Sequence, residues 1–205
     1  MTRRRAWLLC PLVLALFSCE SPAPVAKKKE PEKPPEPVTA RHAFQQMYAA
    51  ARVWAPDLQI IQLASIPITD PKPENGKYGA WQAMFASPSK AKLKPYTYSV
   101  FEAGGNLHKG VFALPEESFS GSRGQAKPFL VQALKIDSDE AYKTAVEKSA
   151  DFIKKNPDMP VMFLAEQTPR FPMLTWRVIW GESVSNSSYS VFVDATTGMF
   201  VAKAH

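Results

Sequence analysis

Histidine, serine and neighbouring carboxylates are the residue types that could support catalysis or metal binding, and their spacing favours neither. His42, His108 and His205 lie far apart, and no Glu or second His stands at metal-ligand spacing beside any of them. The chain has many serines but no Gly-x-Ser-x-Gly pattern. Glu116 and Glu117 are adjacent, so they would point apart in a strand and would not face each other in a helix. We therefore predict no catalytic residues, no metal and no cofactor, and expect that the protein is not an enzyme.

Cysteine has the clearest chemistry in the chain. Only two are present, Cys10 and Cys19. Cys19 follows a basic head at residues 3–5 and a short apolar run at residues 6–17, the order of a bacterial export signal. The order Leu16-Phe17-Ser18-Cys19 resembles a lipobox, which implies cleavage before Cys19 and its acylation. Residues 1–18 are thus predicted to be a lipoprotein signal peptide, with a plain secretory signal or an uncleaved anchor as alternatives.

Residues 19–39 are predicted to be a tether. Prolines alternate there with lysines and glutamates, and no apolar periodicity is present. Such a segment buries too little surface to fold, and its prolines favour an extended conformation. It would hold a folded domain away from a membrane, at the cell envelope and facing the periplasm or the outside. The membrane leaflet is not specified by these residues.

The charge balance excludes a nucleic-acid binder. The whole chain carries +6, but removal of Arg3, Arg4 and Arg5 with the signal leaves 22 basic and 19 acidic side chains. No basic stripe with interleaved aromatic residues occurs, which nucleic-acid binding would require.

An internal repeat organises the rest of the chain. The stretch at residues 54–64 returns in degenerate form at residues 155–165, with Pro56 and Asp57 matching Pro157 and Asp158. Leu63-Ala64 likewise matches Leu164-Ala165. Each copy follows a helical pattern and precedes an apolar run, so it marks the corner between a helix and a strand. Repetition at a fixed offset indicates one supersecondary unit used twice.

The predicted elements follow the same plan in both copies. Thr39 caps a first helix that Pro56 ends, and strands follow at residues 58–68, 81–86, 96–101 and 107–114. Asp137 caps a second helix that ends near Pro157, with strands at residues 161–165, 176–180, 189–193 and 199–202. Hairpin connections make each sheet antiparallel. The predicted fold is α+β, with two tandem helix-plus-antiparallel-sheet (αβββ) units at residues 40–115 and 136–205. Residues 116–135 connect them, and residues 129–136 are either an extra strand or the entry to the second helix.

Four aromatic residues are the candidate ligand-binding side chains. They stand four apart on one strand of each unit: Trp81, Phe85, Trp176 and Trp180. Aromatic residues on a strand face opposite a helix normally belong to the core. If they are exposed instead, they would line a groove for a peptide or glycan.

Two turn-like motifs carry a family resemblance. Residues 135–141 (Lys-Ile-Asp-Ser-Asp-Glu-Ala) and residues 191–198 (Val-Phe-Val-Asp-Ala-Thr-Thr-Gly) resemble the helix start and closing hairpin of a PepSY-type domain. The resemblance covers residues 136–202 and reaches the first unit only through the internal repeat. It implies an exported binding module, in some members a proposed inhibitor of peptidases, without catalytic residues.

Three functional hypotheses follow. The first is a lipid-anchored module that binds, and in some way inhibits or regulates, an envelope protein or peptidase. It would bind through a sheet edge, a groove between the units, or the loops at residues 70–77 and 119–127. The second is a structural lipoprotein that assembles an envelope complex, and the third and weakest is an enzyme. An exposed apolar cleft would favour the first hypothesis.

Overall fold

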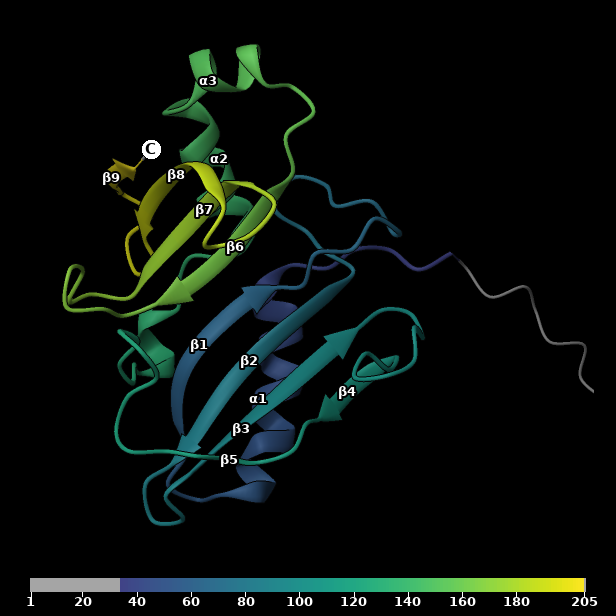
Figure 1. Cartoon of the computed structure of the whole chain (residues 1–205), viewed down its shortest axis with the longest axis vertical. Coiled ribbons are helices and arrows are strands. Elements are labelled where there is room, and N and C mark those ends of the chain that lie inside the picture. The colour runs from purple at the N-terminus through teal and green to yellow at the C-terminus, as the bar shows by residue number, and fades with distance from the viewer. Residues whose placement is uncertain (1–33, 205) are drawn as a thin grey trace, which may run out of the picture. The chain divides into compact units, whose positions relative to one another are not determined.

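One continuous antiparallel sheet runs through both predicted units (Figure 1). The computed structural model describes residues 34–204, which belong to one compact body. The strand order is β4-β3-β2-β1-β6-β7-β8-β9, with β5 paired to β3. The strands are β1 (Gln59–Ser65), β2 (Ala80–Ser87), β3 (Lys92–Ser99), β4 (Gly110–Ala113), β5 (Glu117–Ser118), β6 (Val161–Glu166), β7 (Thr175–Gly181), β8 (Ser187–Asp194) and β9 (Phe200–Ala204). The predicted α+β class is confirmed.

The two halves of the sheet meet at the repeated residues. Leu63 of β1 lies opposite Ala165 of β6, and Ala64 lies opposite Leu164. The Leu-Ala pair of one copy therefore pairs antiparallel with the Leu-Ala pair of the other. This ladder extends over only three residue pairs. Beyond it, Phe163 N–H donates to Ser65 Oγ at one end, and the connector pairs with Ile60 and Gln167 at the other.

The helices α1 (Ala40–Trp54) and α2 (Ser138–Glu147) contribute to one core. α1 packs on β1 to β4, and α2 packs on β7 and β8. The buried side chains of both helices belong to a single apolar cluster. The second helix was predicted as one element, but it is broken. Lys148 closes α2, Ser149 N–H donates to Val146 O, three residues back rather than four, and the short α3 (Ala150–Lys155) follows.

The start of α2 also caps the start of α1. The predicted cap Thr39 accepts a hydrogen bond from His42 N–H, and the predicted cap Asp137 accepts one from Ser138 N–H at 2.7 Å. The Asp137 carboxylate also accepts from Arg41 N–H of α1 at 2.9 Å, and Ser138 Oγ accepts from Ala40 N–H at 2.9 Å. Side chains of α2 thus satisfy backbone donors of α1 that have no partner within their own helix.

The four aromatic candidates lie in the core. The exposed fractions of Trp81, Phe85 and Trp176 are 0%, and that of Trp180 is 2%. Two of the indoles also bind the backbone just before a helix. Trp81 Nε1–H donates to Val38 O, before α1, and Trp176 Nε1–H donates to Ile136 O, before α2. This burial matches the core alternative and not the groove alternative for these residues.

Residues 129–136, predicted as an extra strand or the entry to the second helix, form neither a regular strand nor an extension of α2. They contain a single 3₁₀ turn, η1 (Val131–Ala133). Before that turn, Lys127 and Phe129 form isolated bridges with Gln167 and Ile60. The connector therefore lies between β6 and β1 at the end where β1 begins.

Candidate functional site

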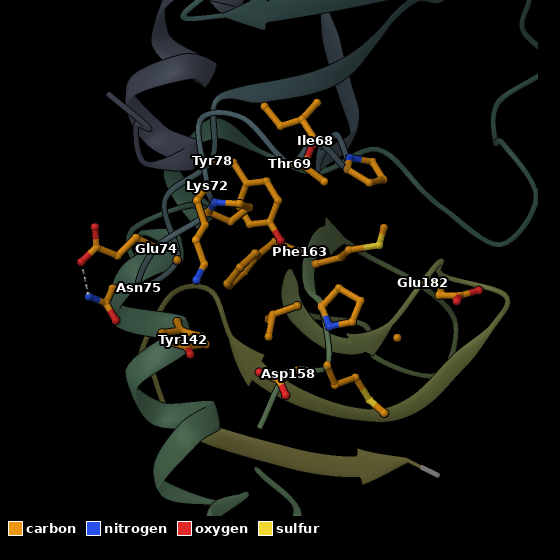
Figure 2. A pocket seen from close by; sticks show the side chains of 18 of the residues that line it. Ile68, Thr69, Lys72, Glu74, Asn75, Tyr78, Tyr142, Asp158, Phe163 and Glu182 are labelled. Carbon is orange, nitrogen blue, oxygen red and sulfur yellow. Dashed lines mark hydrogen bonds between the residues drawn. The ribbon is translucent and has the colours of Figure 1, made fainter. Parts of the chain in front are cut away.

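A groove opens at the other end of the β1–β6 junction, where β1 ends and β6 begins (Figure 2). Its volume is about 730 Å³, within the range of roughly 300–1,000 Å³ that is usual for ligand sites. Four segments supply its walls: the loop at residues 67–78, the corner at residues 157–163, the α2 side chain of Tyr142, and residues 181–182 at the end of β7. The lining is mainly apolar and includes four prolines: Pro67, Pro73, Pro157 and Pro160. This is the groove between the units that the sequence named as one possible binding route.

The loop wall is fixed in place by a tight turn. Asn75 and Gly76 both have positive φ, +47° and +81°, and residues Glu74 and Lys77 pair across them. A Cβ atom on Gly76 would lie 2.5 Å from Ser138 O and 2.6 Å from Asp139 Cα. The turn therefore packs directly on the first turn of α2, and only glycine permits that approach.

The floor of the groove is aromatic. Phe163 lies at its centre, with ring centroids 5.9 Å from Tyr78 and 6.1 Å from Tyr142. Figure 2 shows these three rings around the hollow. Burial raises the pKa of the Tyr78 phenol above its usual value, so the phenol remains neutral. Phe163 and Tyr78 are themselves buried, so they form the packed base of the groove, and Tyr142 is the ring of the three that is partly exposed.

The repeated aspartate has different surroundings in the two copies. The second copy lies in the corner wall of the groove, residues 157–163. In the first copy, Asp57 accepts hydrogen bonds from Ser87 Oγ–H at 2.6 Å and from Ser89 N–H at 2.7 Å. These bonds lower the pKa of Asp57 to about 2. The second copy, counted on from Trp176 and Trp180, has Glu182 at the position of Ser87.

A carboxylate cannot donate a hydrogen bond to Asp158 as the serine does to Asp57. Asp158 has no hydrogen bond or ion pair within the described part of the chain, and it is exposed in the groove lining. The same repeated aspartate is therefore a structural cap in the first copy and a wall residue in the second.

The groove is acidic although the protein as a whole is basic. Three carboxylates line it, from Glu74, Asp158 and Glu182, against the single ammonium group of Lys72. The formal charge of the lining is thus −2, in a chain of net charge +6. In Figure 2, Glu74 and Glu182 lie at opposite ends of the hollow. The arrangement is suited to a ligand that is apolar in the middle and positively charged.

The other residues singled out in the sequence lie elsewhere. Cys19 and His205 lie outside the described residues. His42 Nε2 is 3.4 Å from Tyr98 Oη, and His108 Nδ1 is 2.6 Å from Glu102 Oε1 on a separate loop. Among residues 34–204, no three His, Cys, Asp or Glu side chains come together as a metal site. None of the described helices is long and apolar enough to span a membrane.

Comparison with known proteins gives a fold and no family. No family model matches the chain, and no curated protein matches it. A crystal structure of a "putative lipoprotein" from Clostridium difficile 630 is similar in fold, with a TM-score of 0.51 over 79% of this chain and 91% of that one. The two sequences are 10% identical. At that identity the likeness establishes a shared fold.

Proposed function

We propose that the protein is a lipid-anchored binding module of the bacterial cell envelope, and that it binds a partner in the groove. In this proposal, Cys19 carries the lipid, residues 20–39 form the tether, and two copies of a PepSY-like αβββ unit form the binding body through a fused sheet. Two features support the repeat: the Leu-Ala pairs that meet at the junction, and the tryptophans that hold the residue before each helix cap. The fold neighbour described as a lipoprotein agrees with the anchor.

The groove is the observation that carries this proposal. An exposed apolar cleft is the feature that favours a binding module over an assembly lipoprotein. Val53 on α1 and Leu130 in the connector, the two most exposed large apolar side chains among the described residues, come from separate segments. The partner is accordingly a protein or peptide segment that inserts an apolar stretch. If the partner is an envelope peptidase, occupation of the groove by a peptidase segment would make the module inhibitory or regulatory.

A groove-filling variant tests the proposal. Thr69 is exposed and lines the groove, so Thr69→Trp places an indole in it without disturbing the core. Val53→Trp is the control, because Val53 is 90% exposed on α1 and is not a groove residue. Crosslinking in intact envelopes, followed by isolation of the chain, should recover the same partner with wild type and Val53→Trp and lose it with Thr69→Trp.

The anchor is tested in the same experiment with Cys19→Ala, which should be exported without acylation and recover less of the partner. Equal recovery with all three anchored forms would refute binding in the groove. Equal recovery with Cys19→Ala would refute the role of the anchor. Matching thermal unfolding of the two tryptophan variants establishes that both are folded.

A further inference from the structure

Connector residues 127–129 lie between β1 and β6 at one end of the junction. At the end opposite the groove, the two strands separate and the connector occupies the space. Phe129 N–H donates to Ile60 O and Lys127 N–H donates to Gln167 O, both at 2.9 Å. Phe129 is buried there while Lys127 stays exposed. A short segment of the chain, with one buried aromatic side chain and one exposed lysine, thus closes one end of the junction.

The groove is the open end of the same junction. β6 is longer than its ladder with β1, so residues 161–163 pair with β7 on one side and have no register partner in β1. Phe163 N–H points away from β7 and donates to Ser65 Oγ at 3.0 Å. Because backbone groups alternate along a strand, the N–H and C=O of Val161, two residues earlier, point the same way. Val161 also lines the groove, which therefore has a strand edge with a donor and an acceptor directed into it.

The charges of the groove specify the side chains of the occupant. Asp158 lies in the corner wall three residues before Val161. Glu182 lies just after β7, two residues beyond Trp180, which pairs with Val161. Glu182 accepts one hydrogen bond, from Asn186 Nδ2–H at 3.3 Å, and this leaves most of its acceptor capacity open. A lysine or arginine side chain supplies the donors and the positive charge that both carboxylates lack.

We infer that the groove takes an extended peptide segment that adds to the free edge of β6 at Val161, presents apolar side chains to the apolar lining of the groove, and places a lysine or arginine beside Asp158 and Glu182. The inference rests on the proposed function and names the class of segment bound. Strand addition supplies main-chain hydrogen bonds, and the groove selects side chains.

The test measures fluorescence anisotropy of short labelled peptides with the full chain in detergent micelles. One peptide alternates valine with lysine, a second alternates valine with glutamate, and a third is the lysine peptide with methylated backbone nitrogens. The charge variant is Asp158→Asn/Glu182→Gln, and its matched control is Glu140→Gln/Glu147→Gln, which removes two exposed carboxylates of α2 outside the groove.

The lysine peptide should bind. The glutamate peptide should bind about tenfold more weakly, since two exposed ion pairs, each worth up to about fivefold in affinity, are replaced by like charges. The methylated peptide should also bind more weakly, since it loses the main-chain hydrogen bonds of strand addition. The charge variant should weaken binding of the lysine peptide about tenfold, the control should leave it unchanged, and added salt should weaken it in wild type.

Equal binding of the lysine and glutamate peptides would overturn the assigned charge, and equal binding of the methylated peptide would overturn strand addition. If no peptide binds while Thr69→Trp still loses the envelope partner, this inference fails and the proposed function stands. If Thr69→Trp retains the partner, the proposed function itself fails.

Discussion

Replacement of Gly76 by alanine tests whether the groove wall is held by its packing on α2. Gly76 has φ of +81°, and its added Cβ would meet Ser138 O at 2.5 Å and Asp139 N at 2.8 Å. These are backbone atoms in the first turn of a helix, so they cannot rotate away. Gly104→Ala is the matched control, because Gly104 has φ of +75° and no atom within 4 Å of its added Cβ.

Comparison of the two variants separates the cost of alanine at positive φ, which both share, from the cost of the clash with α2, which only Gly76→Ala has. Alanine at positive φ costs about 1–2 kcal/mol in the folded state, less about 0.4–1 kcal/mol gained by restricting the unfolded chain. Gly104→Ala should therefore lower the free energy of unfolding by about 1 kcal/mol. Gly76→Ala adds the cost of forcing atoms into a filled space, about 1–3 kcal/mol. The expected difference is about 2 kcal/mol, or a Tm about 4–8 °C lower for Gly76→Ala than for Gly104→Ala.

Urea unfolding followed by fluorescence of the buried tryptophans measures this difference. Gly76→Ala should also weaken binding in the groove, since the loop at residues 67–78 must move off α2, whereas Gly104→Ala should not. Equal free energies of unfolding for the two variants, within about 0.5 kcal/mol, would refute the packing of this loop on α2.

Two further predictions concern the carboxylates at the caps and corners. Asp137→Ala should lower the free energy of unfolding by about 2 kcal/mol, because it removes a helix cap and the acceptor for Arg41 N–H. Asp137→Asn keeps an acceptor oxygen and should lower the free energy of unfolding by less than half of that amount. Equal losses for the two variants in urea unfolding would contradict a cap shared by both helices. Hydrogen bonds lower the pKa of Asp57 to about 2, so its contribution to stability is complete above its ordinary pKa of 3.8 and is lost as the pH falls towards 2. Acid unfolding of Asp57→Asn should lack this dependence between about pH 4 and 2, while Asp158→Asn should retain it; identical profiles for wild type and Asp57→Asn would contradict the assignment.

Local patterns were sufficient to predict the helix caps and the approximate place of most elements, but not all of their ends. Thr39 and Asp137 act as caps because a side-chain acceptor before an amphipathic run satisfies free N–H groups, whatever the rest of the fold does. The strand after each corner was also located, since β1 lies within the predicted range 58–68 and β6 extends the predicted range 161–165 by one residue. β3 begins four residues before the strand predicted at residues 96–101, and β5 was not predicted, because strand pairing decides both. The break at Ser149 was missed, because the apolar spacing continues through it and the packing of Phe152 on Tyr189, with centroids 4.4 Å apart, decides the direction of α3.

The groove depends on contacts between residues that are distant in the sequence. The sequence indicated some of the segments that form it, but not how they pack on each other. The loop at residues 70–77 was named as a binding route from its turn chemistry, but its packing on α2 depends on a tertiary contact. The repeat identified Asp57 and Asp158 as equivalents. Their different roles depend on the residue that faces each across the sheet, Ser87 in one case and Glu182 near the other. A comparison of the two copies at these facing positions is the signal that would have indicated Asp158.

Site-specific photocrosslinking from the groove in intact envelopes tests the central claim most directly. A benzophenone amino acid at position 69 places the reactive group in the groove, and the same amino acid at position 53 places it on the exposed face of α1. We predict a crosslinked partner from position 69 that is absent from position 53, and a crosslink on the partner within an extended segment rich in apolar and basic residues. Crosslinks of equal yield from both positions, or from position 53 alone, would contradict a binding site in the groove.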